Sequence, residues 1–125
     1  MELGNLQRAL TLGDALPDMV REMGCCALVA RENGDALAAS KGWARVGIDP
    51  QGIEEKGWSA YLAPEDDIAT QVEVAEMGLR AADGFVNHWI ADDGARVCLR
   101  WHASPWVGPD RIGLSIAEVV PDVAE

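Results

Sequence analysis

The turn sequence Asp92-Asp93-Gly94 is the feature that most constrains the fold of this chain, because it joins two segments rich in strand-forming residues. Those segments are residues 85–91 and 95–106, and an Asp-Gly pair between two such segments is typical of a β-hairpin. A second turn at residues 107–110 leads to a third strand-like segment at 111–120. The last third of the chain is therefore predicted to form three antiparallel strands.

A further hairpin is predicted within residues 25–40. Its turn is Glu32-Asn33-Gly34-Asp35. Asn and Gly both tolerate the positive φ that a type I′ turn requires, so this turn is predicted to be of that type. Two short strands are thus expected before the central part of the chain.

The sequence between the two strand regions predicts helices. Residues 41–62 form short helical pieces interrupted by glycine and proline, which is typical of segments that line pockets. A longer helix is predicted over residues 64–82, because Pro64 suits the first helical position and acidic residues follow it. Apolar residues recur along this helix at helical spacing, which predicts that their face packs inward: Ile68, Val72, Ala75 and Leu79.

The first 24 residues are predicted to be helical and separate from the strands. Three leucines recur there at helical spacing, namely Leu3, Leu6 and Leu10. A break at Gly13-Asp14 precedes a second short helix, expected over residues 17–23. We therefore divide the chain into an N-terminal helical cap, residues 1–24, and a second unit, residues 25–121.

This order of elements predicts an α+β fold with a five-stranded antiparallel sheet. Short helices and one longer helix lie in the middle of the chain, so they are expected to cover one face of the sheet. The length of 125 residues suits one domain, and an apolar fraction of 49% excludes intrinsic disorder.

The charge of the chain excludes several classes of partner. A net charge of −11 argues against binding to nucleic acid or to anionic membrane surfaces, both of which need basic residues. No apolar run reaches the ~18 residues of a bilayer span, and the N-terminus lacks the pattern of a signal peptide. Three cysteines without a CxxC pair fit a reducing compartment, so we expect a cytoplasmic protein.

Three segments resemble the PAS family of sensory and signalling domains. Residues 37–47 resemble the strand-to-helix segment of the family, which ends in Gly, and residues 57–66 resemble the stretch leading into its His-Pro-Glu-Asp helix start. The Asp93-Gly94 turn, followed by Trp101 and Pro105, resembles its hairpin and Trp-rich strand. The resemblance covers roughly residues 25–120 and implies a five-stranded PAS sheet.

The chain also departs from the family pattern. Ser40 stands where the family usually has Asn, and Ala63 stands where it usually has His. Glu118-Val119-Val120 occupies the place of the Asp-Ile-Thr that often couples the domain to a signalling helix. With only five residues after Val120, we expect that the chain is either a part of a longer protein or acts through partners.

A hairpin that turns at Asp93-Gly94 sorts the flanking residues by face. Direct pairing places His88 opposite Leu99, Trp89 opposite Cys98 and Val86 opposite Trp101. The more apolar face is then predicted to lie under the helices: Val86, His88, Ile90, Val97, Leu99 and Trp101. The opposite face carries the remaining residues: Phe85, Asn87, Trp89, Arg96, Cys98, Arg100 and His102.

Pocket candidates follow from this assignment and from the aromatic residues of the central segments. They are His88, Ile90, Leu99, Trp101, Trp43, Trp58 and Tyr61. A histidine on an apolar face can contact a ligand, and the alternative is an imidazole that hydrogen-bonds within the core. The aromatics can line a cavity or simply fill the core.

The opposite face would expose an aromatic patch unless something covers it. The predicted patch consists of Phe85, Trp89 and Cys98. The N-terminal helix with Leu3, Leu6 and Leu10 is the expected cover, either from its own chain or from the mate in a homodimer.

No metal, haem, flavin or catalytic site is expected. His88 and His102 lie on opposite predicted faces, and Cys98 is about 13 Å from His102 along one strand, too far to share an ion. The resemblance implies haem only with a His on the long helix, and flavin photochemistry only with an Asn-Cys-Arg-Phe-Leu motif; the chain has neither. Glu65, Asp66 and Asp67 are explained by the start of a helix.

The sequence therefore favours a sensory PAS module that binds a small molecule between sheet and helices and signals through dimer or N-terminal helix contacts. The alternative is a ligand-free PAS module for protein interaction. An enzyme would require a His/Asp pair facing one pocket, and none is predicted. A sensor is expected to hold a cavity of at least a few hundred Å³.

Overall fold

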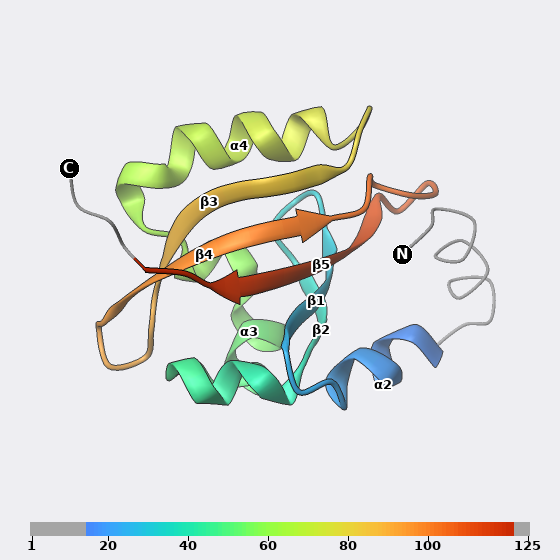
Figure 1. Cartoon of the computed structure of the whole chain (residues 1–125). Coiled ribbons are helices and arrows are strands. Elements are labelled where there is room, and N and C mark those ends of the chain that lie inside the picture. Colours follow the sequence, from blue (N-terminus) through green and yellow to red (C-terminus); the bar gives the residue numbers. More distant parts are fainter. Residues whose placement is uncertain (1–14, 122–125) are drawn as a thin grey trace.

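Five antiparallel strands form one sheet in the order β2-β1-β5-β4-β3 (Figure 1). The computed structural model describes residues 15–121. The strands are β1 (Cys26–Arg31), β2 (Ala36–Ala39), β3 (Ala82–Ile90), β4 (Arg96–Ala103) and β5 (Ile112–Val119). The predicted five-stranded antiparallel sheet is confirmed, and β2 and β3 are its two edges.

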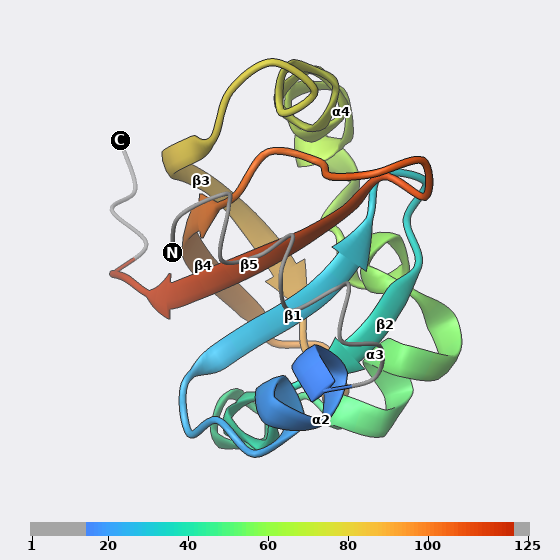
Figure 2. The same cartoon turned by 90° about the vertical axis from the view of Figure 1, so that its right-hand side faces the viewer.

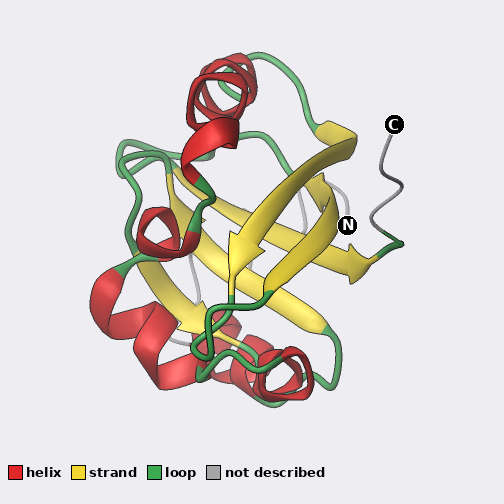
Figure 3. Ribbon diagram, turned by 90° about the vertical axis from the view of Figure 1, so that its left-hand side faces the viewer, coloured by secondary structure: helices red, strands yellow, loops and turns green. Residues whose placement is uncertain are grey.

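Helices between β2 and β3 gather on one side of the sheet, which we call the inner face (Figure 3). They are η1 (Lys41–Val46), α3 (Pro50–Lys56), η2 (Trp58–Tyr61), η3 (Pro64–Asp66) and α4 (Asp67–Glu76), where η denotes a 3₁₀ helix. The helix before β1, α2 (Ala15–Arg21), packs on the other side, which we call the outer face. Figure 2 shows α2 and α4 at opposite ends of the molecule.

Each face of the sheet has its own apolar core. The inner core includes Trp43, Ile53 and Leu99, none of which is exposed to solvent. The smaller outer core places Leu16 and Val20 of α2 against the small side chains of β1 and β2. The sheet is therefore buried on both sides where β1 lies.

The β1–β2 turn is not of type I′. Gly34 has a positive φ of 109°, but Asn33 does not. The Asn33 side chain instead accepts a hydrogen bond from the backbone N–H of Asp35, at 3.0 Å, which lets the turn close without two left-handed residues. Gly34 is also needed for space, because an added Cβ would approach Ser59 Oγ to 2.9 Å.

The β3–β4 hairpin is predicted correctly, but its register is one residue away from the prediction. Ala91 N–H donates to Ala95 O at 2.7 Å, so the loop has three residues, Asp92, Asp93 and Gly94, rather than two. Gly94 takes the left-handed conformation that ends such a loop, with φ of 88°. His88 consequently pairs with Cys98.

A shift of one residue moves every side chain of one strand to the other face. Asn87 and Trp89 lie on the inner face, opposite Leu99 and Val97. His88 lies on the outer face, together with Val86 and Ile90, which corrects the predicted positions of all three. The β4 residues Val97, Leu99 and Trp101 keep their predicted inward position.

Helix α4 ends at Glu76, earlier than predicted, and it packs through the opposite face from the predicted one. Thr70 is buried on it, as is Met77 just after it, whereas the predicted inward residues Ile68, Val72 and Leu79 are 81%, 55% and 92% exposed. Three hydrogen bonds set this orientation: Asn87 Nδ2 to Thr70 Oγ1, Trp106 Nε1 to Val74 O and Trp106 N to Met77 O.

Candidate ligand-binding cavity

A cavity of about 60 Å³ lies beneath α4, on the inner face of the sheet. Its walls come from α4, from β1, β3, β4 and β5, from Trp58 at the start of η2, and from Met77 and Trp106 outside the helices and strands. A cavity is thus present at the predicted place, between the sheet and the helices. Its volume is well below the few hundred Å³ expected for a sensor.

A chain of hydrogen bonds crosses one wall of the cavity. Trp101 Nε1 donates to Asn87 Oδ1 at 2.7 Å, and Asn87 Nδ2 donates to Thr70 Oγ1 at 3.2 Å. Asn87 and Thr70 are each 4% exposed. Buried polar groups of this kind are costly unless they are satisfied, so the three side chains fix β4, β3 and α4 relative to one another.

Glu73 and Ser115 add polar groups to a lining that is otherwise mainly apolar. The Glu73 side chain on α4 is 16% exposed and lies 3.4 Å from the guanidinium of Arg80. Ser115 on β5 is 7% exposed. These groups contribute little to the surface of the cavity, which is almost entirely apolar.

Four aromatic rings pack against one another beside the cavity. Trp89 stacks on Trp43 with ring centroids 4.8 Å apart and contacts Trp101 at 5.3 Å and Tyr61 at 5.7 Å. Trp43 donates its indole N–H to Ala27 O at 3.0 Å. Burial raises the pKa of the Tyr61 hydroxyl, with Asp92 adding to the shift. The cluster fills the core on this side of the cavity with packed rings.

The predicted pocket residues divide into three groups. Trp58 and Trp101 line the cavity, and Trp43, Tyr61 and Leu99 belong to the core behind it. His88 and Ile90 do not contribute to the lining, because the register turns them to the outer face.

The sequence interpretation missed several lining residues for the same reason. Asn87, Trp89 and Phe85 were assigned to the outer face, yet they line the cavity. Correctly counting the loop as three residues would have placed all three inward, since Gly94 and the two preceding aspartates are the pattern of a three-residue loop.

His88 forms a pair with Asp66 away from the cavity. Asp66 Oδ2 lies 2.9 Å from His88 Nδ1 and accepts the backbone N–H of His88 at 2.8 Å. Ala63 N–H donates to His88 O at 2.9 Å. These contacts cover part of the open edge of β3 with η3 and the residue before it, which protects the edge from pairing with another strand.

The predicted outer aromatic patch is not formed. Phe85 and Trp89 face inward, and Cys98 remains on the outer face but is only 7% exposed. Leu3, Leu6 and Leu10 lie outside the described residues, so their expected packing on this face stays a prediction.

The cysteines lie away from the cavity. Cys25 and Cys26 are at the start of β1, Cys98 is on β4, and all three are free thiols. Burial raises the pKa of Cys26 to about 11. Within residues 15–121, no three His, Cys, Asp or Glu side chains are grouped to hold a metal ion. No helix in that range has the length and apolarity of a membrane span.

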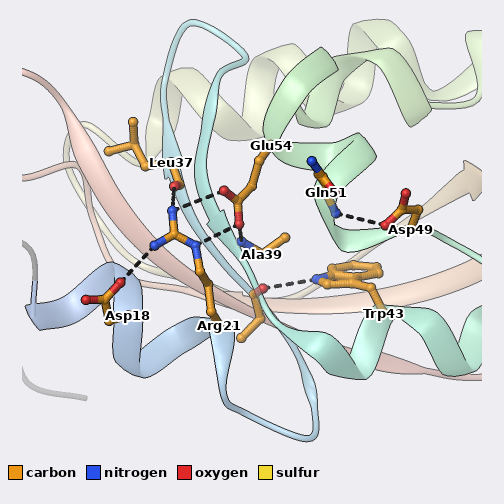
Figure 4. A network of polar contacts seen from close by, with 9 residues as sticks. Asp18, Arg21, Leu37, Ala39, Trp43, Asp49, Gln51 and Glu54 are labelled. Carbon is orange, nitrogen blue, oxygen red and sulfur yellow. Dashed lines mark hydrogen bonds and ion pairs between the residues drawn. The ribbon is translucent and has the colours of Figure 1, made fainter.

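Arg21 links α2 to α3 across the open edge of β2 (Figure 4). Its guanidinium binds both carboxylate oxygens of Glu54, at 3.0 and 3.1 Å, and donates to Leu37 O at 3.1 Å. Glu54 in turn accepts the backbone N–H of Ala39 at 3.0 Å. Burial opposes ionisation of Glu54, but Arg21 and Ala39 outweigh it and lower its pKa.

This sheet order, a run of short helices on one face and a cavity beneath the longest of them define a class of small α+β domains. No family model and no curated protein matches the sequence. Solved structures do match it. The PAS domain of an HTR-like protein from Haloarcula marismortui aligns with a TM-score of 0.64 and 13% identity over 95% of this chain and all of that one.

Two further structures give the same result. A LOV protein of Rhodobacter sphaeroides aligns with a TM-score of 0.69 and 10% identity, over 98% of this chain and 70% of that chain. A domain of a sensory box sensor histidine kinase/response regulator from Geobacter sulfurreducens aligns at 0.65 and 13%, over 87% and 95%. The chain has the PAS fold.

Proposed function

We propose that this chain is a sensory signalling module that binds a small molecule in the cavity beneath α4. The observation that carries the proposal is the Trp101–Asn87–Thr70 chain, which places an amide and a hydroxyl in the cavity wall and joins the sheet to the helix. Sensor domains among the structural neighbours support a signalling role.

The volume of the cavity limits its occupant. A water molecule needs roughly 10–15 Å³ of such space, so about 60 Å³ suits a molecule with a handful of non-hydrogen atoms. The carboxylate of Glu73 favours a neutral or cationic occupant over an anion. A larger ligand requires α4 to move away from the sheet.

Signalling follows from a difference in affinity between two positions of α4. An occupant that bonds to Asn87 competes with Thr70 for the amide, and this changes how α4 packs on the sheet. A ligand shifts such an equilibrium only by its differential affinity for the two states. We propose that the change reaches a dimer mate or the N-terminal helix through the sheet, without catalysis, bound cofactor or metal, in a cytoplasmic protein.

Native mass spectrometry of the purified chain tests the proposal. We expect a small molecule that co-purifies, leaves on denaturation and is absent from Ala103→Leu, whose side chain fills the cavity. Ala60→Leu, at an exposed position, is the matched control and keeps the ligand. A bare wild-type protein, or the same ligand on Ala103→Leu, contradicts binding in this cavity.

A ligand-free interaction module is the second candidate. The small cavity and the exposed apolar side chains of α4 favour it. On this alternative, filling the cavity with Ala103→Leu stabilises the protein and leaves its interactions unchanged.

A further inference from the structure

The exposed face of α4 carries a continuous apolar stripe. Ile68, Val72, Ala75 and Leu79 follow one another at intervals of four, three and four residues, and all four are exposed. Arg80 N–H donates to Glu76 O at 3.1 Å, so the helical path continues beyond the last residue of α4 and keeps Leu79 on the same side. This spacing is that of the a and d positions of a coiled coil, which pack against a second helix.

The stripe is exposed even though α4 is already packed against the rest of the domain. The opposite side of the helix already packs on the sheet through Thr70, Val74 and Met77 and lines the cavity. Contiguous apolar surface of this kind marks interaction sites in soluble proteins. The two sides of α4 therefore have separate roles.

The charge around the stripe indicates what kind of helix fits it. Residues 64–80 contain five acidic residues, Glu65, Asp66, Asp67, Glu73 and Glu76, and one basic residue, Arg80. Arg80 pairs with Glu73 and Glu76, and Arg96 of β4 pairs with Glu65, so this segment together with Arg96 carries a net charge of −3. The whole chain carries −11. A second copy would bring like charge to this surface, whereas a helix with basic side chains beside its apolar residues would complement it.

We propose that the stripe on α4 binds an amphipathic helix of a partner protein, with apolar residues at the same spacing and Lys or Arg on both sides of them. The partner helix packs its apolar residues between those of α4, and its basic side chains lie near the acidic residues of η3 and α4. The partner can bind whether or not the cavity is occupied, because the stripe faces away from the cavity.

The stripe and the cavity are coupled through α4. α4 lies between the proposed partner and the cavity, so a partner that favours one position of α4 changes the affinity of the cavity, and an occupant of the cavity changes the affinity for the partner by the same factor.

A designed helical peptide is the probe for this surface. The peptide has Leu at every a and d position and Lys at every e and g position, and a second peptide has Glu in place of Lys. Titration is followed by calorimetry with the full chain. We expect the Lys peptide to bind, the binding to weaken as salt is added, and the Glu peptide to bind at least tenfold more weakly.

Two variants of the chain separate this surface from other binding. Ile68→Glu with Leu79→Glu changes only exposed side chains, so the fold is kept, and we expect at least a tenfold loss of affinity for the Lys peptide. Met19→Glu on α2, also exposed, is the matched control and keeps the affinity.

Three outcomes of the titrations overturn the proposal. They are no binding of the Lys peptide, equal binding to the chain with Ile68→Glu and Leu79→Glu, and equal binding of both peptides. A concentration-dependent dimer, seen by sedimentation and lost in the same double variant, also overturns it, because the occupant is then a second copy. None of these results depends on a ligand in the cavity, so they are distinguishable from failure of the proposed function.

Discussion

The two ends of the molecule hold their helices to the sheet in different ways. At one end, α2 and α3 are joined by the Arg21–Glu54 ion pair, which also satisfies backbone groups at the edge of β2. At the other end, α4 is held by neutral hydrogen bonds from Asn87 and Trp106, with a cavity beneath it. The difference indicates a fixed end and an adaptable end of one sheet.

Trp106 is the residue whose loss should disturb the α4 end most. Its ring packs on Gly113, where an added Cβ would approach it to 3.1 Å. Its indole N–H donates to Val74 O of α4, and its backbone N–H donates to Met77 O just after the helix. We expect Trp106→Ala to lower the free energy of unfolding by about 3–5 kcal/mol, measured by urea denaturation.

Trp106→Phe separates the ring from the indole N–H. It keeps most of the packing and removes the bond to Val74 O, so the expected loss is about 1 kcal/mol. Hydrogen exchange should speed up in α4 and stay unchanged in α2. Equal acceleration at both ends would contradict the distinction between them.

Arg21→Ala is the corresponding change at the other end. The Arg21 side chain is 42% exposed, so solvent weakens its ion pair, and we expect a loss of about 1–2 kcal/mol in unfolding free energy. Asp18 also binds Arg21, at 2.9 Å, but its side chain is 74% exposed, so Asp18→Ala should change the free energy of unfolding far less than Arg21→Ala does. Hydrogen exchange in α2 and at the β2 edge should speed up, while α4 stays protected.

Lowering the pH should protonate Glu54 and weaken the attachment of α2 to α3 and β2. The pKa of Glu54 is lowered in the folded state, so its contribution is full above its ordinary value of 4.5 and is lost as pH falls through the folded value. Because the group is partly exposed, we expect less than about 1 kcal/mol. Urea denaturation of wild type and Glu54→Gln between neutral pH and acid measures it; a constant difference between the two curves would show that Glu54 does not contribute.

The strands could be predicted because each is bounded by a local turn signal. Asn33-Gly34 and Asp93-Gly94 both mark hairpins, and the order of the elements was sufficient to infer the sheet. The β3 register depends on whether Asp92 is counted as part of the loop. That choice changes the face of every β3 side chain. A two-residue loop would turn His88 toward the cavity, whereas the observed three-residue loop turns Asn87 toward it.

The orientation of α4 depends on residues far away in the sequence. Periodicity shows that the helix has an apolar side, but the hydrogen bonds that decide which side packs come from Asn87 and Trp106. The pairing of Arg21 with Glu54 spans 33 residues and likewise has no local signal. Sequence patterns identify the elements here, and long-range contacts choose their faces.

The three-residue loop between β3 and β4 has a consequence for how such a pocket diversifies. Deleting or inserting one residue there would exchange all the β3 side chains that reach the interior, while the strands, the sheet order and the helices stay in place. Chains of nearly identical sequence could then differ completely in the chemistry of one wall. A change of length in a surface turn would thus alter ligand preference more abruptly than point mutations in the wall itself.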